Sequence, residues 1–163
     1  MTKTKGIFPI LLRLLALGAT VAAIVVMVTS HQSAEVLNLT FTAKYNNEPV
    51  FVFFVIAEAI AGGYSLLVLV LSAKSFLWRL IIISDVIVTV LLTSTISAAL
   101  AIARVGKQGN SHAGWLPICG QVPKFCDHVT GALVSGFAAA IIYLLLLLYS
   151  LHAVLSPVFS VNP

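Results

Sequence analysis

The chain has 163 residues, of which 60% are hydrophobic and only 9% are charged, and its formal net charge is +4. A soluble domain usually carries about a quarter charged residues, so this chain has too little polar surface to cover a soluble core. The composition therefore excludes an ordinary soluble domain and indicates a membrane protein.

Four apolar stretches are each long enough to cross a bilayer as a helix. They run over residues 7–28, 50–71, 77–103 and 129–155. A helix needs about 20 residues to span the roughly 30 Å hydrocarbon core. We therefore predict an all-α four-helix transmembrane bundle that takes in the whole chain as a single membrane domain. The first stretch is too long for the apolar core of a signal peptide, so we expect it to be retained.

The distribution of cations predicts the orientation of the bundle. An even number of spans places both termini on one side. Lys3 and Lys5 lie in the short N-terminal tail, and the short connection between the second and third helices carries two further cations. Because positive charge in short segments stays on the cytoplasmic side, we expect cytoplasmic termini and extracellular loops at about 29–49 and 104–128.

The first helix carries Arg13, the second Glu58 and the third Asp85. Charged residues inside a membrane are costly and are usually paired or functional. Measured from the cytoplasmic face, Arg13 and Asp85 lie at similar depths of roughly 9 and 10 Å, whereas Glu58 lies roughly 18 Å from that face. We predict an Arg13–Asp85 ion pair that joins the first and third helices, with Glu58 as a possible second intramembrane acid.

The first long loop contains the sequence Asn-Leu-Thr at residues 38–40. This is an acceptor sequence for N-glycosylation, so Asn38 is a potential glycosylation site if the loop faces the lumen and then the outside. The sequon also lies close to the end of the first helix.

Polar and small residues recur at a spacing of four in the predicted helices. Asp85, Thr89, Thr93 and Ser97 lie on one face of the third helix, and we expect them to hydrogen-bond to neighbouring helices, with a water-lined pore as the alternative. Pairs of small residues allow helices to pack closely, either within the bundle or between subunits. These pairs are Ala19 and Ala23, Ala59 and Gly63, Gly131 and Ser135, and Gly136 and Ala140.

The second long loop holds the chain's two cysteines, Cys119 and Cys126. In an oxidising compartment, two cysteines this close in a loop rich in glycine and proline indicate a disulfide. The alternative is a zinc site that also uses His112 and His128. The spacing does not match the tight cysteine pairs of structural zinc sites, so we expect the disulfide and no metal.

The chain carries no motif of a catalytic domain, such as a P-loop, a dinucleotide-binding turn or a metalloprotease helix. We therefore expect no catalysis and no cofactor. The modest positive charge suits anionic lipid headgroups better than nucleic acid, so membrane lipids are the expected partners and nucleic acid is not.

Three segments carry a resemblance to a known family. They are "RLLALGATVAAIVVMVTS" at 13–30, "TAKYNNEPVFVFFV" at 42–55 and "SAALAIARVGKQGNSHAGWLPICGQVPKFCDHVTGA" at 97–132. The chain resembles the CASP-like proteins, relatives of the plant Casparian strip membrane domain proteins and of the MARVEL tetraspan proteins.

The resemblance implies four helices with cytoplasmic termini. It also implies an arginine in the first helix, an aspartate in the third and cysteines in the second loop. These correspond to Arg13, Asp85, Cys119 and Cys126.

The resemblance further implies a plasma-membrane scaffold that assembles with copies of itself or with related members, and that positions cell-wall-modifying enzymes. The first loop lacks the Pro-Phe-Phe signature of true Casparian strip members. We therefore expect a scaffold role outside that structure. The alternative is a small ion channel or a proton- or ion-coupled transporter that uses Arg13, Glu58 and Asp85.

Overall fold

The computed structural model describes residues 4–36, 39–71 and 78–159. Its elements are helix α1 (Thr4–Val28), strands β1 (His31–Val36) and β2 (Leu39–Lys44), a 3-10 turn η1 (Tyr45–Asn47), and helices α2 (Pro49–Leu71), α3 (Trp78–Gln108) and α4 (Pro123–Phe159). The four α-helices of these described segments are each long and apolar enough to cross a membrane. The predicted four-span bundle is thus confirmed.

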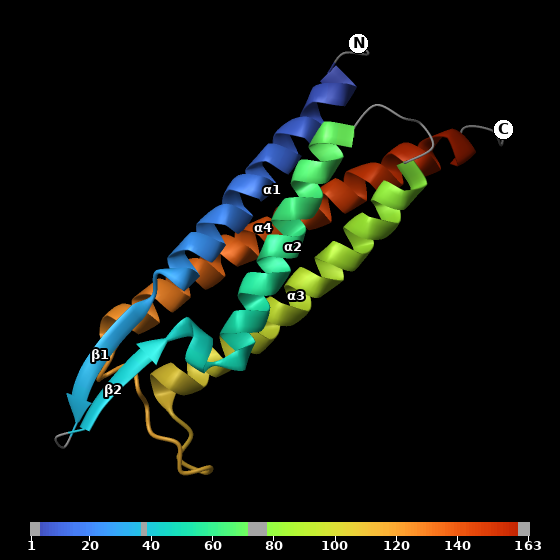
Figure 1. The fold of residues 1–163 in the computed structure, drawn as a ribbon. Helices are drawn as coiled ribbons and strands as arrows, with labels where there is room; N and C mark the ends of the chain where they lie inside the picture. Colours follow the sequence, from blue (N-terminus) through green and yellow to red (C-terminus); the bar gives the residue numbers. More distant parts are fainter. Residues whose placement is uncertain (1–3, 37–38, 72–77, 160–163) are drawn as a thin grey trace.

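The helices lie side by side in an elongated bundle, and α1 begins at the end of the bundle where α4 finishes (Figure 1). Helix α1 packs against α4 and α2, and α3 packs against the same two helices. Helices α1 and α3 therefore stand at opposite corners of the bundle, so a direct link between them requires long side chains.

Each helix turns a narrow stripe of small or apolar side chains inward. In α1 the buried residues include Leu12, Ala16, Thr20, Ala23 and Met27, which recur every three or four positions as one helical face requires. Alanine at many of these inward positions lets the helix backbones approach closely. Bulky side chains such as Leu15 and Val21 lie on the outer surface, where lipid is the solvent.

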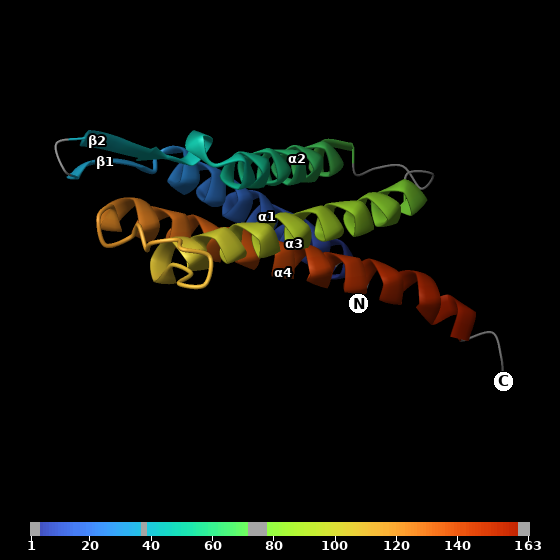
Figure 2. The same cartoon turned by 90° about the horizontal axis from the view of Figure 1, so that it is seen from below.

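The first connection folds into a β-hairpin that we did not predict. Strands β1 and β2 are antiparallel, with His31 opposite Lys44 and Val36 opposite Leu39. Figure 2 shows the hairpin extending beyond the helices at the end opposite the termini. The strands are short and mix polar with apolar residues, so their pattern does not stand out from an ordinary loop. Asn38 lies outside the described residues.

The second connection is shorter than predicted, because α3 runs on to Gln108 and α4 begins at Pro123. Hydropathy marks where a helix leaves the hydrocarbon, but hydrogen bonding continues through the polar turn that follows. Proline is favoured at the first position of a helix because its missing N–H would have no helical partner there. The remaining loop, residues 109–122, is held by an Asn110–Trp115 bridge and by Gly109, whose φ is 69°.

Candidate functional site

A buried ion pair joins the opposite corners of the bundle. Nη2 of Arg13 on α1 donates to both carboxylate oxygens of Asp85 on α3, at 2.9 Å each. Arg13 is 5% exposed and Asp85 is 0% exposed, so the pair is shielded from solvent and lipid. The structure therefore brings together the two residues whose predicted depths in the membrane are similar.

Tyr64 of α2 completes this cluster. Its hydroxyl lies 2.9 Å from Oδ1 of Asp85 and 2.9 Å from the backbone oxygen of Ile81, and it donates toward both acceptors. The guanidinium carbon of Arg13 lies 5.2 Å from the centre of the Tyr64 ring, which adds a cation–π contact. One tyrosine thus links α2 to both charged residues. Sequence reasoning missed it, although a tyrosine inside an apolar stretch needs a partner for its hydroxyl.

A second polar cluster joins α2 to α4. The hydroxyl of Tyr143 donates to the backbone oxygen of Ala61, and it lies 2.7 Å from the hydroxyl of Ser65. A tyrosine has only one hydroxyl hydrogen, and a carbonyl can only accept. The Ser65 hydroxyl must therefore donate to Tyr143, so both hydroxyl groups of this cluster have partners.

Glu58 of α2 stands apart from these clusters. It is fully buried, yet neither of its carboxyl oxygens has a hydrogen-bond partner among the described residues. It fits because Gly136 of α4 lacks a side chain, since a Cβ added there would lie 2.6 Å from Oε1 of Glu58. The structure does not bring Glu58 to Arg13, whose Nη1 is also without a partner in the described part of the chain.

Of the polar stripe on α3, only Asp85 links helices as we expected among the described residues. The hydroxyls of Thr89, Thr93 and Ser97 each donate to the backbone oxygen four residues earlier in α3, at 2.7, 2.9 and 2.7 Å. The expected role in helix–helix hydrogen bonding was therefore wrong for these three residues. Spacing of four places residues on one face, but the same geometry brings a hydroxyl within reach of its own helix backbone.

Cys119 and Cys126 form a disulfide, with Cα atoms 5.7 Å apart. Cys126 lies in the first turns of α4, so the bridge ties the 109–122 loop to a helix. His112 and His128 are both exposed, and His128 Nδ1 lies 2.7 Å from the backbone oxygen of Lys124. No group of three or more histidine, cysteine or acidic side chains is placed to hold a metal within the described segments.

Comparisons with known proteins identify the family of this chain. The family described as "Casparian strip membrane protein domain" matches residues 2–142. CASP-like protein 1C2 of Populus trichocarpa is 69% identical over 163 residues, which is 100% of both chains. CASP-like protein 1C2 of Ricinus communis is 65% identical over 159 residues, which cover 98% of this chain and 97% of the relative.

CASP-like protein 1C1 of Vitis vinifera is 64% identical over 157 residues, which cover 96% of this chain and 99% of the relative. No solved structure is a significant match. The resemblance carried by the first helix and the second loop is confirmed at the level of the family. The chain is a multi-pass membrane protein and belongs to the Casparian strip membrane protein domain family.

Proposed function

We propose that this protein is a self-associating scaffold of the plasma membrane, which organises membrane subdomains and recruits cell-wall-modifying proteins. Its termini are cytoplasmic in this proposal. The Cys119–Cys126 disulfide supports that orientation, because disulfides persist on the oxidising side of a membrane. The loop between α3 and α4, which contains Cys119, lies at the end of the bundle opposite the termini (Figure 1).

The observation that carries self-association is the placement of the small-residue pairs. Ala23, Gly136 and Ala140 point into the bundle, whereas Gly131 is exposed but already has Val26 of α1 within 3.7 Å of the position that a Cβ would occupy. The remaining pair behaves differently.

Ala59 and Gly63 of α2 are both exposed on the outer surface, and nothing lies within 4 Å of the position that a Cβ would occupy at Gly63. A small-residue pair at this spacing that faces lipid lets a second helix approach closely, which is the contact that drives association of membrane helices.

The interior supports the same proposal. Arg13 and Asp85 neutralise each other, and Tyr64, Ser65 and Tyr143 have their hydroxyl hydrogens placed on acceptors. Polar groups that satisfy one another fix the shape of the bundle and leave few free donors or acceptors to carry an ion. The core therefore fits a rigid unit for assembly better than a conduit.

The test compares Ala59→Leu and Gly63→Leu with the matched control Ala138→Leu, which adds the same bulk at an exposed position on α4. Fluorescently tagged copies would be followed by energy transfer between donor and acceptor and by photobleaching recovery in the plasma membrane. We expect the two α2 variants to lose energy transfer and diffuse faster, while Ala138→Leu behaves as the parent. Equal association of all three variants would contradict this interface.

A second function, ion- or proton-coupled transport, is favoured by one observation, the buried and unpartnered carboxyl of Glu58. Purified protein in liposomes distinguishes the two functions, because a scaffold should show no flux above protein-free vesicles. A specific flux that Asp85→Asn or Glu58→Gln abolishes would replace the scaffold proposal with the transport proposal.

A further inference from the structure

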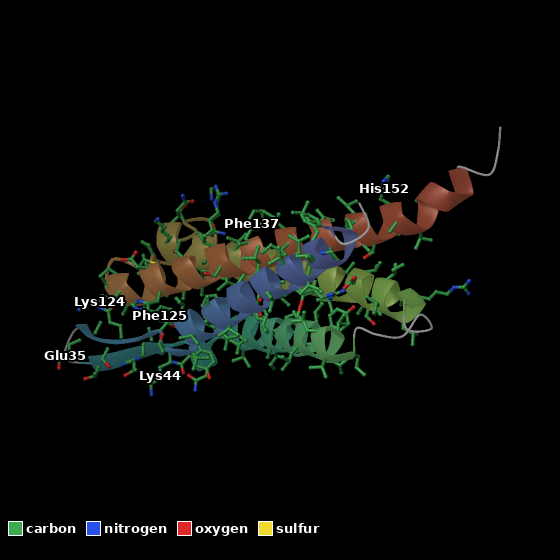
Figure 3. All side chains as sticks on the ribbon, turned by 90° about the horizontal axis from the view of Figure 1, so that it is seen from above. Glu35, Lys44, Lys124, Phe125, Phe137 and His152 are labelled. Atoms are coloured by element: carbon green, nitrogen blue, oxygen red, sulfur yellow. A yellow bond between two sulfur atoms is a disulfide. The ribbon has the colours of Figure 1, made fainter. Side chains whose placement is uncertain are left out.

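A groove of about 730 Å³ lies between α3 and α4 on the surface of the bundle, near the end that carries the 109–122 loop. Arg104 and Lys107 line one part of it, and Leu100, Val134 and Phe137 line another. Figure 3 shows Phe137 on the side of α4 that faces away from α2. The groove is thus open toward the surrounding lipid, not toward the core.

The polar and apolar parts of the groove are separated along the membrane normal. Lys107 lies seven residues beyond Leu100 in α3, and Phe137 lies seven residues beyond Thr130 in the antiparallel α4. Seven residues of α-helix rise about 10 Å. The apolar stretch ends near residue 103, so the two cations lie at the level of the headgroups. Toward the middle of the bilayer, Leu100 lies about 6 Å from Arg104 and about 10 Å from Lys107 along the helix.

No carboxylate of the described residues pairs with either cation. Arg104 Nε donates to the side-chain oxygen of Gln108 at 3.3 Å, which is a neutral acceptor. Two adjacent positive charges above an apolar groove are complementary to a molecule with an anionic head and a hydrocarbon tail.

We propose that this groove binds an anionic phospholipid of the outer leaflet, because the proposed orientation places the 109–122 loop outside the cell. Its phosphate contacts Arg104 and Lys107, and one acyl chain lies along Leu100, Val134 and Phe137. Two cations exceed the single charge of a phosphate, so a zwitterionic lipid would bring its ammonium group into an already positive region. The site should therefore prefer phosphatidylglycerol to phosphatidylcholine with the same acyl chains.

The experiment uses the purified full chain in detergent and measures retained lipid by native mass spectrometry. Phosphatidylglycerol and phosphatidylcholine with identical chains are titrated into the parent, Arg104→Gln, Lys107→Gln and the double variant. Lys44→Gln and Lys124→Gln serve as charge controls, because both are exposed cations at the same end of the bundle that do not line the groove. A third probe, glycerophosphoglycerol, carries the same singly charged phosphodiester headgroup without acyl chains.

We expect Arg104→Gln and Lys107→Gln each to lower phosphatidylglycerol retention roughly fivefold. The two charge controls should leave retention unchanged. Val134→Trp, which fills the groove, should also displace the lipid, whereas Val90→Trp, at an exposed position on α3 outside the groove, should not. Equal retention of the two lipids, or unchanged phosphatidylglycerol retention in the double variant, would overturn the proposal. Glycerophosphoglycerol that binds as tightly as phosphatidylglycerol would also overturn it. A variant enters the comparison only if its elution profile matches that of the folded parent.

Discussion

Removal of one charge from the Arg13–Asp85 pair is the sharpest test of how the bundle is held together. In Asp85→Leu, the Arg13 guanidinium would remain 5% exposed while Nη2 loses both of its 2.9 Å bonds and Nη1 has no described partner to replace them. In Arg13→Leu, the fully buried carboxylate would keep only the Tyr64 hydroxyl. A buried pair broken in this way typically costs about 3–5 kcal/mol.

The double variant should behave differently because no unpaired charge remains. Tyr64 would lose Asp85 as an acceptor, but the backbone oxygen of Ile81 lies at the same 2.9 Å, so its hydroxyl stays satisfied. Replacing a buried pair with apolar side chains is often close to neutral. The loss in Arg13→Leu with Asp85→Leu should thus fall well below the sum of the single losses.

Exchanging the charges, in Arg13→Asp with Asp85→Arg, should restore less. The Tyr64 hydroxyl and the new guanidinium would then both be donors, and they would face each other where a carboxylate stood. The free energy of unfolding would be measured for all variants by denaturant titration in detergent as a double-mutant cycle, with delivery to the cell surface as a second readout. Strictly additive losses would refute the coupling of the two residues.

Two further predictions concern the packing of α2 against α4 and the outer loop. Gly136→Ala should lower the free energy of unfolding by about 1–3 kcal/mol, because the new Cβ would lie 2.6 Å from Glu58 Oε1. Gly63→Ala, with nothing within 4 Å, should instead raise it by about 0.5–1 kcal/mol because alanine is the better helix former, and equal thermal shifts of the two variants would contradict the packing. Membrane-impermeant thiol labels should reach Cys119 and Cys126 on intact cells only after reduction. Reduction should cost about 2–3 kcal/mol by the loop-closure model, and labelling without a reductant would contradict the bridge.

The four-helix bundle and the Arg13–Asp85 pair could be predicted because both follow from lengths that can be counted along the sequence. The bilayer sets a minimum length for an apolar helix, so four such stretches predict four spans. The helix rise per residue is fixed, so the positions of Arg13 and Asp85 convert to depths, and depth limits which charges can meet. Neither step requires knowledge of how the helices pack.

The other partners depend on how each helix is rotated about its axis, and hydropathy does not report that rotation. Helix α2 is apolar on nearly every side, so its sequence does not reveal that Tyr64 faces Asp85 or that Ser65 faces Tyr143. The hairpin and the polar ends of α3 and α4 were missed for a different reason. They are stabilised by backbone hydrogen bonds outside the hydrocarbon. In that region hydropathy does not distinguish a helix or a strand from a loop.

Helix α2 connects the interior of the bundle to its proposed association surface. Hydrogen bonds to two other helices fix the rotation of α2 about its own axis. They are formed within little more than one turn, by Tyr64 to α3 and by Ala61 and Ser65 to α4. Two residues turn an α-helix by about 200°, so Gly63 lies nearly opposite both Ala61 and Ser65. The buried bonds that hold these two positions inward therefore also hold Gly63 outward, together with Ala59 one turn away. In the proposed scaffold, the polar interior would serve assembly by keeping one small-residue face of α2 in contact with lipid.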